Sequence, residues 1–314
     1  MRRFLCTVMI LTLSVCALFA RGDRDGSANN GKPDVVVTNF PAYDFTRQIA
    51  GDRINLAMLL PPGAESHSFE PTPRDIIQIQ NSEVFIYTGG ETDVWVDRIL
   101  QSMDTSSIKI IRMMDTVDVV EEEIVEGMEE EEGESEEEIA YDEHVWTSPG
   151  NAKRIVQAIT DALCESDGDD AALFRRNARE YTAQLDELDR EFQEIVNNAR
   201  RKTIVFGDRF PFRYFADAYG LSYFAAFPGC STETEPSAAT VAFLIDKVRA
   251  ERIPVIFHIE LSNERMADTI SAETGAKKLL LHACHNVSKR DFDSGVTYLE
   301  LQRANVPRLR EALQ

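Results

Sequence analysis

Between residues 169 and 202 the sequence carries one helical pattern that neither glycine nor proline interrupts. Apolar residues recur every three or four positions, as expected for a helix that buries one face. These residues are Leu173, Phe174, Ala178, Tyr181, Leu185, Leu188, Phe192, Ile195 and Ala199. At 1.5 Å per residue such a helix spans roughly 45 Å. It is long enough to join two separate folded lobes.

Short apolar segments alternate with helical patterns on both sides of this segment. Before it, "DVVVTNF", "INLAMLL", "EVFIYTG" and "IKIIRMM" are the strand-like segments; after it, they are "TIVFGD", "LSYFAAF", "PVIFHIE" and "KKLLLHA". Such alternation is typical of parallel sheets covered by helices. The sequence therefore predicts an α/β protein with two doubly wound, Rossmann-like lobes. The predicted N-terminal lobe is residues 33–168, the connecting helix 169–202 and the C-terminal lobe 203–314.

The first 20 residues have the form of a secretory signal peptide. Arg2 and Arg3 precede an apolar run that is too short for a comfortable membrane span. Three outcomes are open: cleavage after Ala20, lipidation of Cys16, or retention as an uncleaved anchor. Each of them places the protein outside the cytoplasm. Residues 21–32 are polar and contain glycine, which is typical of a flexible tether.

A low-complexity acidic run, "EEEIVEGMEEEEGESEEE", occupies residues 121–138. It offers little apolar surface to bury, so we expect a disordered loop. One interpretation is that this loop only makes the protein more soluble. The other is that its clustered carboxylates raise the local concentration of cations. The formal net charge of the whole chain is −21. This charge disfavours nucleic acid as a partner and favours cations.

Five cysteines are present, and two of them lie in the predicted signal peptide. The remaining three are Cys164, Cys230 and Cys284, so at most one intramolecular disulfide can form. Outside the cytoplasm a disulfide is permitted, and Cys230 and Cys284 both follow predicted strands of the second lobe. The alternatives are two small buried residues, or a Cys284 thiolate that binds metal.

The five histidines and two acidic residues lie where parallel sheets carry their functional side chains. Most of them directly follow a predicted strand, and one histidine precedes a helix instead. Zinc binds imidazole readily. The sequence has no Cys-x-x-Cys pair, His-Glu-x-x-His helix, Gly-x-Ser-x-Gly elbow, phosphate loop or dinucleotide fingerprint. It therefore predicts a metal-binding protein and not an enzyme, with candidates His67, His144, Asp208, His258, Glu260, His282 and His285.

Several stretches resemble the extracytoplasmic solute-binding proteins of zinc and manganese ABC transporters, from about Val35 to the C-terminus. "TNFPAYDFTRQIAGDRINLAMLLPPGAESHSFEPTPRDI" is similar to the family's first ligand loop, and "DEHVWTSPGNA" to its second ligand motif. "YFADAYGL", "EPSAAT" and "ADTISAETGAK" resemble landmarks of the second lobe. The resemblance implies His67 and His144 as ligands, a metal site in the interlobe cleft, and delivery to a membrane permease.

The second lobe departs from the family pattern. Arg209 stands where many members have a third ligand, and a guanidinium has no lone pair to offer a metal. Asp208 either substitutes for that ligand or pairs with Arg209. His282 stands where the family often has an aspartate, and His285 follows three residues later. The resemblance implies that one or both of these histidines complete the site.

His258 and Glu260 end a neighbouring predicted strand. Each is either a ligand or a residue that orients one, because a carboxylate can accept the second N–H of a metal-bound imidazole.

The resemblance implies an exported, monomeric zinc receptor for an ABC importer, because a site rich in imidazole suits zinc. A manganese or iron receptor that uses Glu260 or Asp208 is the alternative within the same family. A zinc-dependent hydrolase and a surface adhesin are the alternatives from other classes.

Overall fold

The computed structural model describes residues 31–128, 140–230 and 236–314. Residues 33–314 form one compact unit, and residues 1–32 are a separate unit. The predicted signal peptide and almost all of the predicted tether therefore lie outside the described residues. Among the described helices, none has both the length and the apolar character that crossing a membrane requires.

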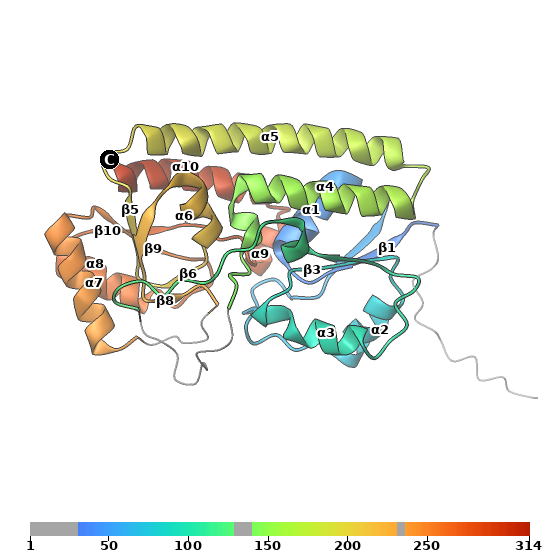
Figure 1. Cartoon of the computed structure of the whole chain (residues 1–314), viewed down its shortest axis with the longest axis horizontal. Helices are drawn as coiled ribbons and strands as arrows, with labels where there is room; N and C mark the ends of the chain where they lie inside the picture. Colours follow the sequence, from blue (N-terminus) through green and yellow to red (C-terminus); the bar gives the residue numbers. More distant parts are fainter. Residues whose placement is uncertain (1–30, 129–139, 231–235) are drawn as a thin grey trace, which may run out of the picture. The chain divides into compact units, whose positions relative to one another are not determined.

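The first lobe is built on a parallel sheet with the strand order β2-β1-β3-β4. Side chains of β1 alternate between two apolar layers, as expected for a strand that is covered on both faces. Val35 and Val37 belong to the apolar cluster that includes residues of α1 and α4, whereas Val36 belongs to the cluster that includes residues of α2 and α3. These two pairs of helices lie on opposite faces of the sheet (Figure 1). The strands are β1 (Asp34–Val37), β2 (Asn55–Met58), β3 (Val84–Tyr87) and β4 (Lys109–Arg112), and the helices are α1 (Phe40–Ala50), α2 (Pro73–Gln80), α3 (Val94–Leu100) and α4 (Pro149–Ser166).

The second lobe repeats this plan with the strand order β10-β9-β5-β7. Val205 and Ile256 pack toward α7 and α8, whereas Phe206 and Phe257 face the opposite layer. The strands are β5 (Thr203–Phe206), β7 (Ser222–Phe224), β9 (Val255–His258) and β10 (Lys277–Leu280), with a small pair β6 (Arg209–Phe210) and β8 (Phe227–Pro228). The helices are α6 (Arg213–Tyr219), α7 (Ala238–Glu251), α8 (Arg265–Thr274), α9 (Lys289–Asp293) and α10 (Tyr298–Leu313). All the ladders between these strands are parallel, so the prediction of an α/β fold with parallel sheets is confirmed.

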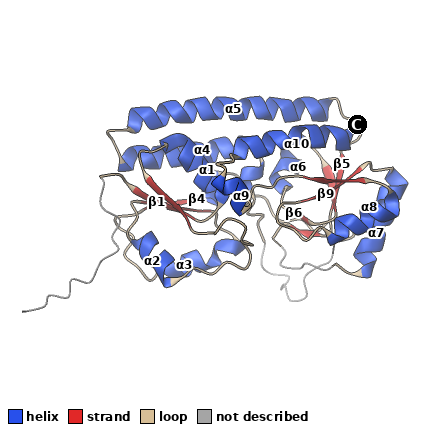
Figure 2. Cartoon of the chain, turned by 180° about the vertical axis from the view of Figure 1, so that it is seen from behind, coloured by secondary structure: helices blue, strands red, loops and turns tan. Residues whose placement is uncertain are grey.

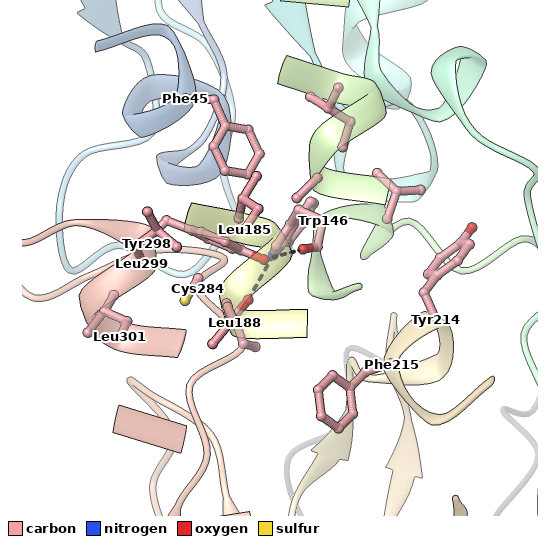
Figure 3. Close-up of a cluster of buried hydrophobic side chains, with 14 of the residues drawn as sticks. Phe45, Trp146, Leu185, Leu188, Tyr214, Phe215, Cys284, Tyr298, Leu299 and Leu301 are labelled. Atoms are coloured by element: carbon pink, nitrogen blue, oxygen red, sulfur yellow. Dashed lines mark hydrogen bonds between the residues drawn. The ribbon is translucent and has the colours of Figure 1, made fainter. Parts of the chain in front are cut away.

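Helix α5 (Ala171–Asn197) runs over both lobes and lies beside α10 (Figure 1 and Figure 2). It is shorter at both ends than the predicted range 169–202. Its apolar face belongs to one hydrophobic cluster that continues into both lobes. Figure 3 shows part of this cluster, in which Phe45 from α1, Leu185 from α5 and Leu301 from α10 contribute. The two lobes therefore share a core and are not joined by a helix alone.

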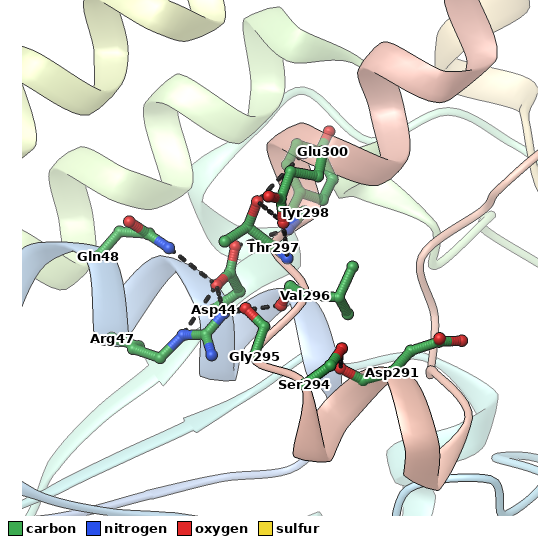
Figure 4. A network of polar contacts seen from close by, with 10 residues as sticks. All are labelled: Asp44, Arg47, Gln48, Asp291, Ser294, Gly295, Val296, Thr297, Tyr298 and Glu300. Carbon is green, nitrogen blue, oxygen red and sulfur yellow. Dashed lines mark hydrogen bonds and ion pairs between the residues drawn. The ribbon is translucent and has the colours of Figure 1, made fainter.

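A buried carboxylate ties α1 to the start of α10 (Figure 4). Asp44 is fully buried and accepts hydrogen bonds from the side chains of Arg47 and Gln48 and from the backbone N–H of Tyr298. The guanidinium of Arg47 also donates to the carbonyl oxygen of Val296. Because Tyr298 N is one of the unpaired donors at a helix start, Asp44 both caps α10 and fixes it to the first lobe.

The beginning of the acidic run is ordered, which corrects the expectation of a disordered loop from residue 121. Glu121 forms a β-bridge with Tyr141, and the Glu122 carboxylate accepts the backbone N–H of Cys230 in the second lobe. Val125 and Met128 pack against the shared core. The apolar residues scattered among these acids provide the anchorage. Residues 129–139, the most acidic part, lie outside the described residues.

Candidate metal centre

Four side chains from both lobes converge on one point. His67 lies in the loop between β2 and α2, Glu143 and His144 immediately precede a 3-10 helix (Val145–Thr147), and His285 lies in the loop after β10. Each of the four offers a nitrogen or oxygen atom within 4.8 Å of the others. Among the described residues this is the only group of three or more histidine, cysteine or acidic side chains that meets this spacing.

The rings of the three histidines face one another at close range. The ring centre of His285 lies 6.0 Å from that of His67 and 5.3 Å from that of His144. A cavity of about 30 Å³ adjoins the rings, and its lining also includes Glu65, Arg209 and Glu260. The cavity has room for a single small ion, and three imidazole nitrogens are available to bind it.

Hydrogen bonds to backbone carbonyl oxygens join the loops that carry these histidines. The side-chain amide of Asn286 donates to the carbonyl oxygens of Pro61 and Ala64, both at 2.9 Å. The N–H of Gly63 donates to the carbonyl oxygen of Val287. The loop of His67 is therefore fixed directly to the loop of His285 before any ion arrives.

Trp146 makes the corresponding link for His144. Its indole N–H donates to the carbonyl oxygen of Ala283 at 2.7 Å, and its own carbonyl oxygen accepts the hydroxyl of Tyr298. The ring of Trp146 lies 5.0 Å from that of His285 and 5.5 Å from that of His144. A fully buried tryptophan therefore positions both imidazoles.

His144 is oriented by a buried carboxylate and by a close approach of the second lobe. Asp142 accepts the backbone N–H of His144 and lies 3.2 Å from its ring nitrogen Nδ1. This pairing directs Nε2 toward the cluster, as carboxylates do for metal-binding histidines. A Cβ at Gly229 would lie 3.3 Å from the Cε1 atom of His144 and 2.9 Å from the Phe210 carbonyl oxygen. Glycine is required there because the second lobe packs so tightly on this ring.

The pKa values of the cluster divide it into two kinds of group. Burial and the charge of Arg209 lower the pKa of His67 to about 3. Burial and the charges of His144 and His67 hold the pKa of His285 well below its ordinary value. Burial alone would lower the pKa of His144, but the Asp142 carboxylate and its acidic neighbours raise it. Two of the three imidazoles are therefore neutral in the empty site.

Glu143 is the carboxylate of the cluster. Burial raises its pKa to about 7. Its two oxygens accept hydrogen bonds from the backbone N–H and the hydroxyl of Thr92 in its own lobe. Its orientation is thus set by Thr92.

Glu260 lines the cavity but is not part of the four-residue group. Its carboxylate accepts the backbone N–H groups of Ala283 and His285 at 2.8 and 3.0 Å. Burial raises its pKa to about 7. The residue between these donors, Cys284, has a left-handed backbone with φ of 64°. Glu260 therefore holds a strained loop in the shape that presents His285.

Arg209 and Asp208 do not pair with each other through their side chains. The Asp208 carboxylate accepts the backbone N–H groups of Arg209 and Ile259. The Arg209 guanidinium instead forms an ion pair with Glu65 at 3.2 Å. Asp208 consequently acts as a backbone cap in the second lobe and lies outside the four-residue group.

His282 and His258 lie outside the group as well. Asn305 holds the backbone of His282 on both sides, by accepting its N–H and donating to its carbonyl oxygen. Burial and the nearby charge of Arg308 lower the pKa of His282 to about 4. His258 is buried at the end of β9, where its Nδ1 lies 3.2 Å from the carbonyl oxygen of Ile259.

Cys230 and Cys284 are free thiols, so the disulfide considered from the sequence is not formed. Each lies in a different environment. Cys230 lies beside the acidic side chains of Glu143, Asp142 and Glu122. The Cys284 sulfur accepts the Gln302 amide at 3.4 Å. Burial raises the pKa of both thiols well above the ordinary value, so Cys284 is not poised as a thiolate ligand.

The sequence had not singled out Glu143, Asp142 or Trp146. All three lie in "DEHVW" around His144, so their adjacency to a candidate ligand was the available signal. The ion pair between Glu65 and Arg209 joins residues 144 positions apart. A contact between residues so far apart in the sequence cannot be predicted from a local sequence pattern.

Comparison with known proteins places this architecture in a family. The model of the zinc-uptake complex component A, periplasmic, matches residues 35–312. The chain is 32% identical over 97% of its length to the zinc-binding lipoprotein AdcA of Streptococcus pneumoniae strain R6, of which it covers 60%. It is 31% identical over 99% of its length to the high-affinity zinc uptake system protein ZnuA of Bacillus subtilis, of which it covers 96%.

A solved structure agrees with these relatives. The zinc-bound ZnuA-like domain of the pneumococcal AdcA superposes with a TM-score of 0.75 at 30% identity, covering 90% of this chain and 99% of that one. The chain thus spans about 60% of the length of the pneumococcal lipoprotein and all but 1% of its ZnuA-like domain. With two parallel-sheet lobes and a match that spans nearly all of the described residues, the chain belongs to the zinc-uptake complex component A family of periplasmic proteins.

Proposed function

We propose that this chain is an extracytoplasmic zinc receptor that delivers its ion to the permease of an ABC importer. The observation that carries the proposal is the group of three imidazoles and one carboxylate drawn from two lobes. Relatives over almost the whole chain are named for zinc binding and zinc uptake. The zinc ion is the cargo of this receptor. The site therefore has to bind and release the ion and does not have to catalyse a reaction.

We assign His67, His144 and His285 as the metal ligands. A set of three imidazole nitrogens favours zinc over manganese, which prefers oxygen ligands. Glu143 is already held through both oxygens by Thr92, so we assign it to balancing the charge of the ion. Glu260 positions His285 and does not bind the metal. His282, His258 and Asp208 have no direct part in the site.

The proposal also covers the location and the oligomeric state of the protein. The predicted signal peptide exports the chain, which then either remains anchored through a lipid on Cys16 or is released after Ala20. Mass spectrometry of protein isolated from cells separates these two forms. We propose that the receptor acts as a monomer, without nucleic acid and without enzymatic turnover.

The test is calorimetry on protein stripped of metal. Wild-type protein is expected to bind one zinc ion, and the substitutions His67→Ala, His144→Ala and His285→Ala are each expected to weaken binding strongly. His282→Ala and His258→Ala serve as matched controls, since both are buried or half-buried histidines of the second lobe. Competition with manganese checks the metal. Unchanged zinc binding in His285→Ala, or its loss in His282→Ala, would overturn the assignment.

A further inference from the structure

The metal cavity is bordered by an ion pair between the two lobes. Glu65 lies in the loop after β2, two residues before His67, and Arg209 begins β6 in the second lobe. The guanidinium nitrogen Nη2 of Arg209 lies 3.2 Å from Oε2 of Glu65. Both residues line the 30 Å³ cavity next to the histidines. They also line a neighbouring cavity of about 180 Å³, so the pair stands between two hollow spaces.

One partner of the ion pair is nearly buried and the other is half-exposed. The side chain of Arg209 is only 12% exposed, whereas that of Glu65 is 43% exposed. The arginine is thus held in the second lobe, where Asp208 also fixes its backbone. The carboxylate sits on the more accessible side and belongs to the loop that carries His67. Opening the pair would release the Glu65 side chain from the rim of the cavity, while the carbonyl oxygen of the neighbouring Ala64 stays bound to Asn286.

The positive charge of Arg209 also acts on side chains of the metal site. Burial favours the neutral form of Glu65, but the Arg209 guanidinium and His67 together hold the pKa of that carboxyl below its ordinary value. The same positive charge is felt by His67 and His285. The carboxylate of Glu65 offsets the positive charge of Arg209 at the edge of the cation site, so a variant that breaks the pair changes the local charge as well as the contact between the two loops.

We propose that the Glu65–Arg209 ion pair is a latch that controls the rate of metal exchange, with both residues acting as positioning residues and not as ligands. This inference rests on the proposed zinc site. A closed latch covers the ion, and the ion enters or leaves while the pair is open. A latch of this kind changes entry and exit by the same factor. It therefore alters both rate constants and leaves the dissociation constant nearly unchanged.

The variant Glu65→Gln separates a latch from a simple effect of charge. Removing a carboxylate at the mouth of a cation site slows capture if only charge matters. It speeds capture if the latch matters, because the pair no longer has to open. Arg209→Met opens the same latch from the other side. The two variants therefore change the exit rate in the same direction for a latch, and in opposite directions for charge alone.

The measurement is stopped-flow zinc binding and chelator capture on the full-length protein. Glu65→Gln and Arg209→Met are each expected to raise both rate constants about two- to fivefold, the range of a partly exposed ion pair. The double variant is expected to equal either single variant, and Arg209→Lys is expected to restore part of the slow exchange. Salt is expected to speed exchange in the wild type but not in the variants that lack the pair.

Glu273→Gln is the matched control, because it breaks the Arg249–Glu273 pair of equal length, 3.2 Å, on the surface of the second lobe. Slower capture by Glu65→Gln, or additive effects in the double variant, would overturn the latch. If the wild type binds no zinc, the proposed function fails first. Hydrogen exchange of residues 65–67 in the metal-free protein then still tests the latch, which predicts faster exchange in both single variants and unchanged exchange in the control.

Discussion

His144 differs from the other two imidazoles of the site in its surroundings. Asp142 lies against its ring nitrogen, and acidic neighbours raise its pKa. His67 and His285 lie in apolar or positively charged surroundings that lower theirs. The three residues share one chemistry, yet only His144 competes for protons near neutral pH. The site therefore responds to pH mainly through one residue.

This difference predicts a shallow pH dependence of zinc affinity. Zinc needs deprotonated ligands, and below its raised pKa His144 must lose a proton when the ion binds. His67 and His285 are already neutral and release none. We expect affinity to fall as pH drops below 7, with the release of one proton, or two if Glu143 also ionises. Calorimetry in buffers of different ionisation enthalpy counts these protons between pH 5.5 and 7.5. Release of three would contradict the assignment.

Trp146 provides a second test at the scale of single residues. Trp146→Phe removes the indole N–H and leaves the Ala283 carbonyl oxygen without its 2.7 Å partner. We expect the free energy of unfolding of the metal-free protein to fall by about 1–3 kcal/mol, and zinc affinity to fall as His285 loosens. Trp95→Phe is the control, because the indole nitrogen of Trp95 has no hydrogen-bond partner among the residues that the structure describes. If urea denaturation shows equal losses in the free energy of unfolding for the two variants, the hydrogen bond of Trp146 does not contribute to stability.

At the scale of elements, the junction between α1 and α10 depends on one carboxylate. Asp44→Ala leaves Arg47 without its buried partner and Tyr298 N without its cap. We expect the free energy of unfolding to fall by about 3 kcal/mol. Asp186→Ala breaks the exposed pair with Lys153 and should cost at most about 1 kcal/mol. Urea denaturation compares them, and a loss below 1 kcal/mol for Asp44→Ala would refute the importance of this junction.

The strands and helices could be predicted from the sequence, whereas the loops between them could not. Apolar segments such as "DVVVTNF" and the spacing of apolar residues along α5 predict which side chains are buried. Within a strand or a helix, the regular backbone geometry decides the face on which each side chain lies. The choice between His282 and His285 had no such basis. They lie on either side of Cys284, whose left-handed backbone belongs to neither a strand nor a helix. Neither strand nor helix periodicity applies across such a residue. Only the folded structure of the loop therefore tells which of the two histidines belongs to the site.

Motif resemblance supplied His67 and His144 as candidates because each lies in a stretch with local sequence character. It could not supply Glu143 as a neighbour of His285, or Glu65 as the partner of Arg209. Those contacts arise only when loops from two lobes meet. The acidic run was misjudged at its start for a related reason. Composition describes what a segment can bury by itself, and residues 121–128 are anchored by a surface of the other lobe.

At the scale of the whole molecule, one hydrophobic cluster passes through both lobes. Helices α5 and α10 contribute to it side by side (Figure 2). Exposing the core of either lobe therefore exposes part of the other. Two lobes that were linked only by a chain segment would each have a core of their own.

The shared core predicts a single cooperative unfolding transition for residues 33–314. The calorimetric and van't Hoff enthalpies of the metal-free protein should agree. Two resolved transitions in the heat-capacity scan would show that the lobes unfold independently. Zinc should move the single transition to higher temperature, because it binds the folded state alone. His67→Ala should abolish that shift while leaving one transition.

The low pKa of His67 and His285 has a consequence for where such a receptor can work. An unstructured histidine-rich peptide takes up protons near pH 6.5, and its hold on zinc fails as its surroundings acidify. The folded loops keep two of three imidazoles neutral through the same range. In a mildly acidic medium the receptor would therefore lose zinc affinity through His144 alone, and less steeply than a flexible peptide in which every histidine takes up a proton. This difference would come from burial and not from a larger number of histidines.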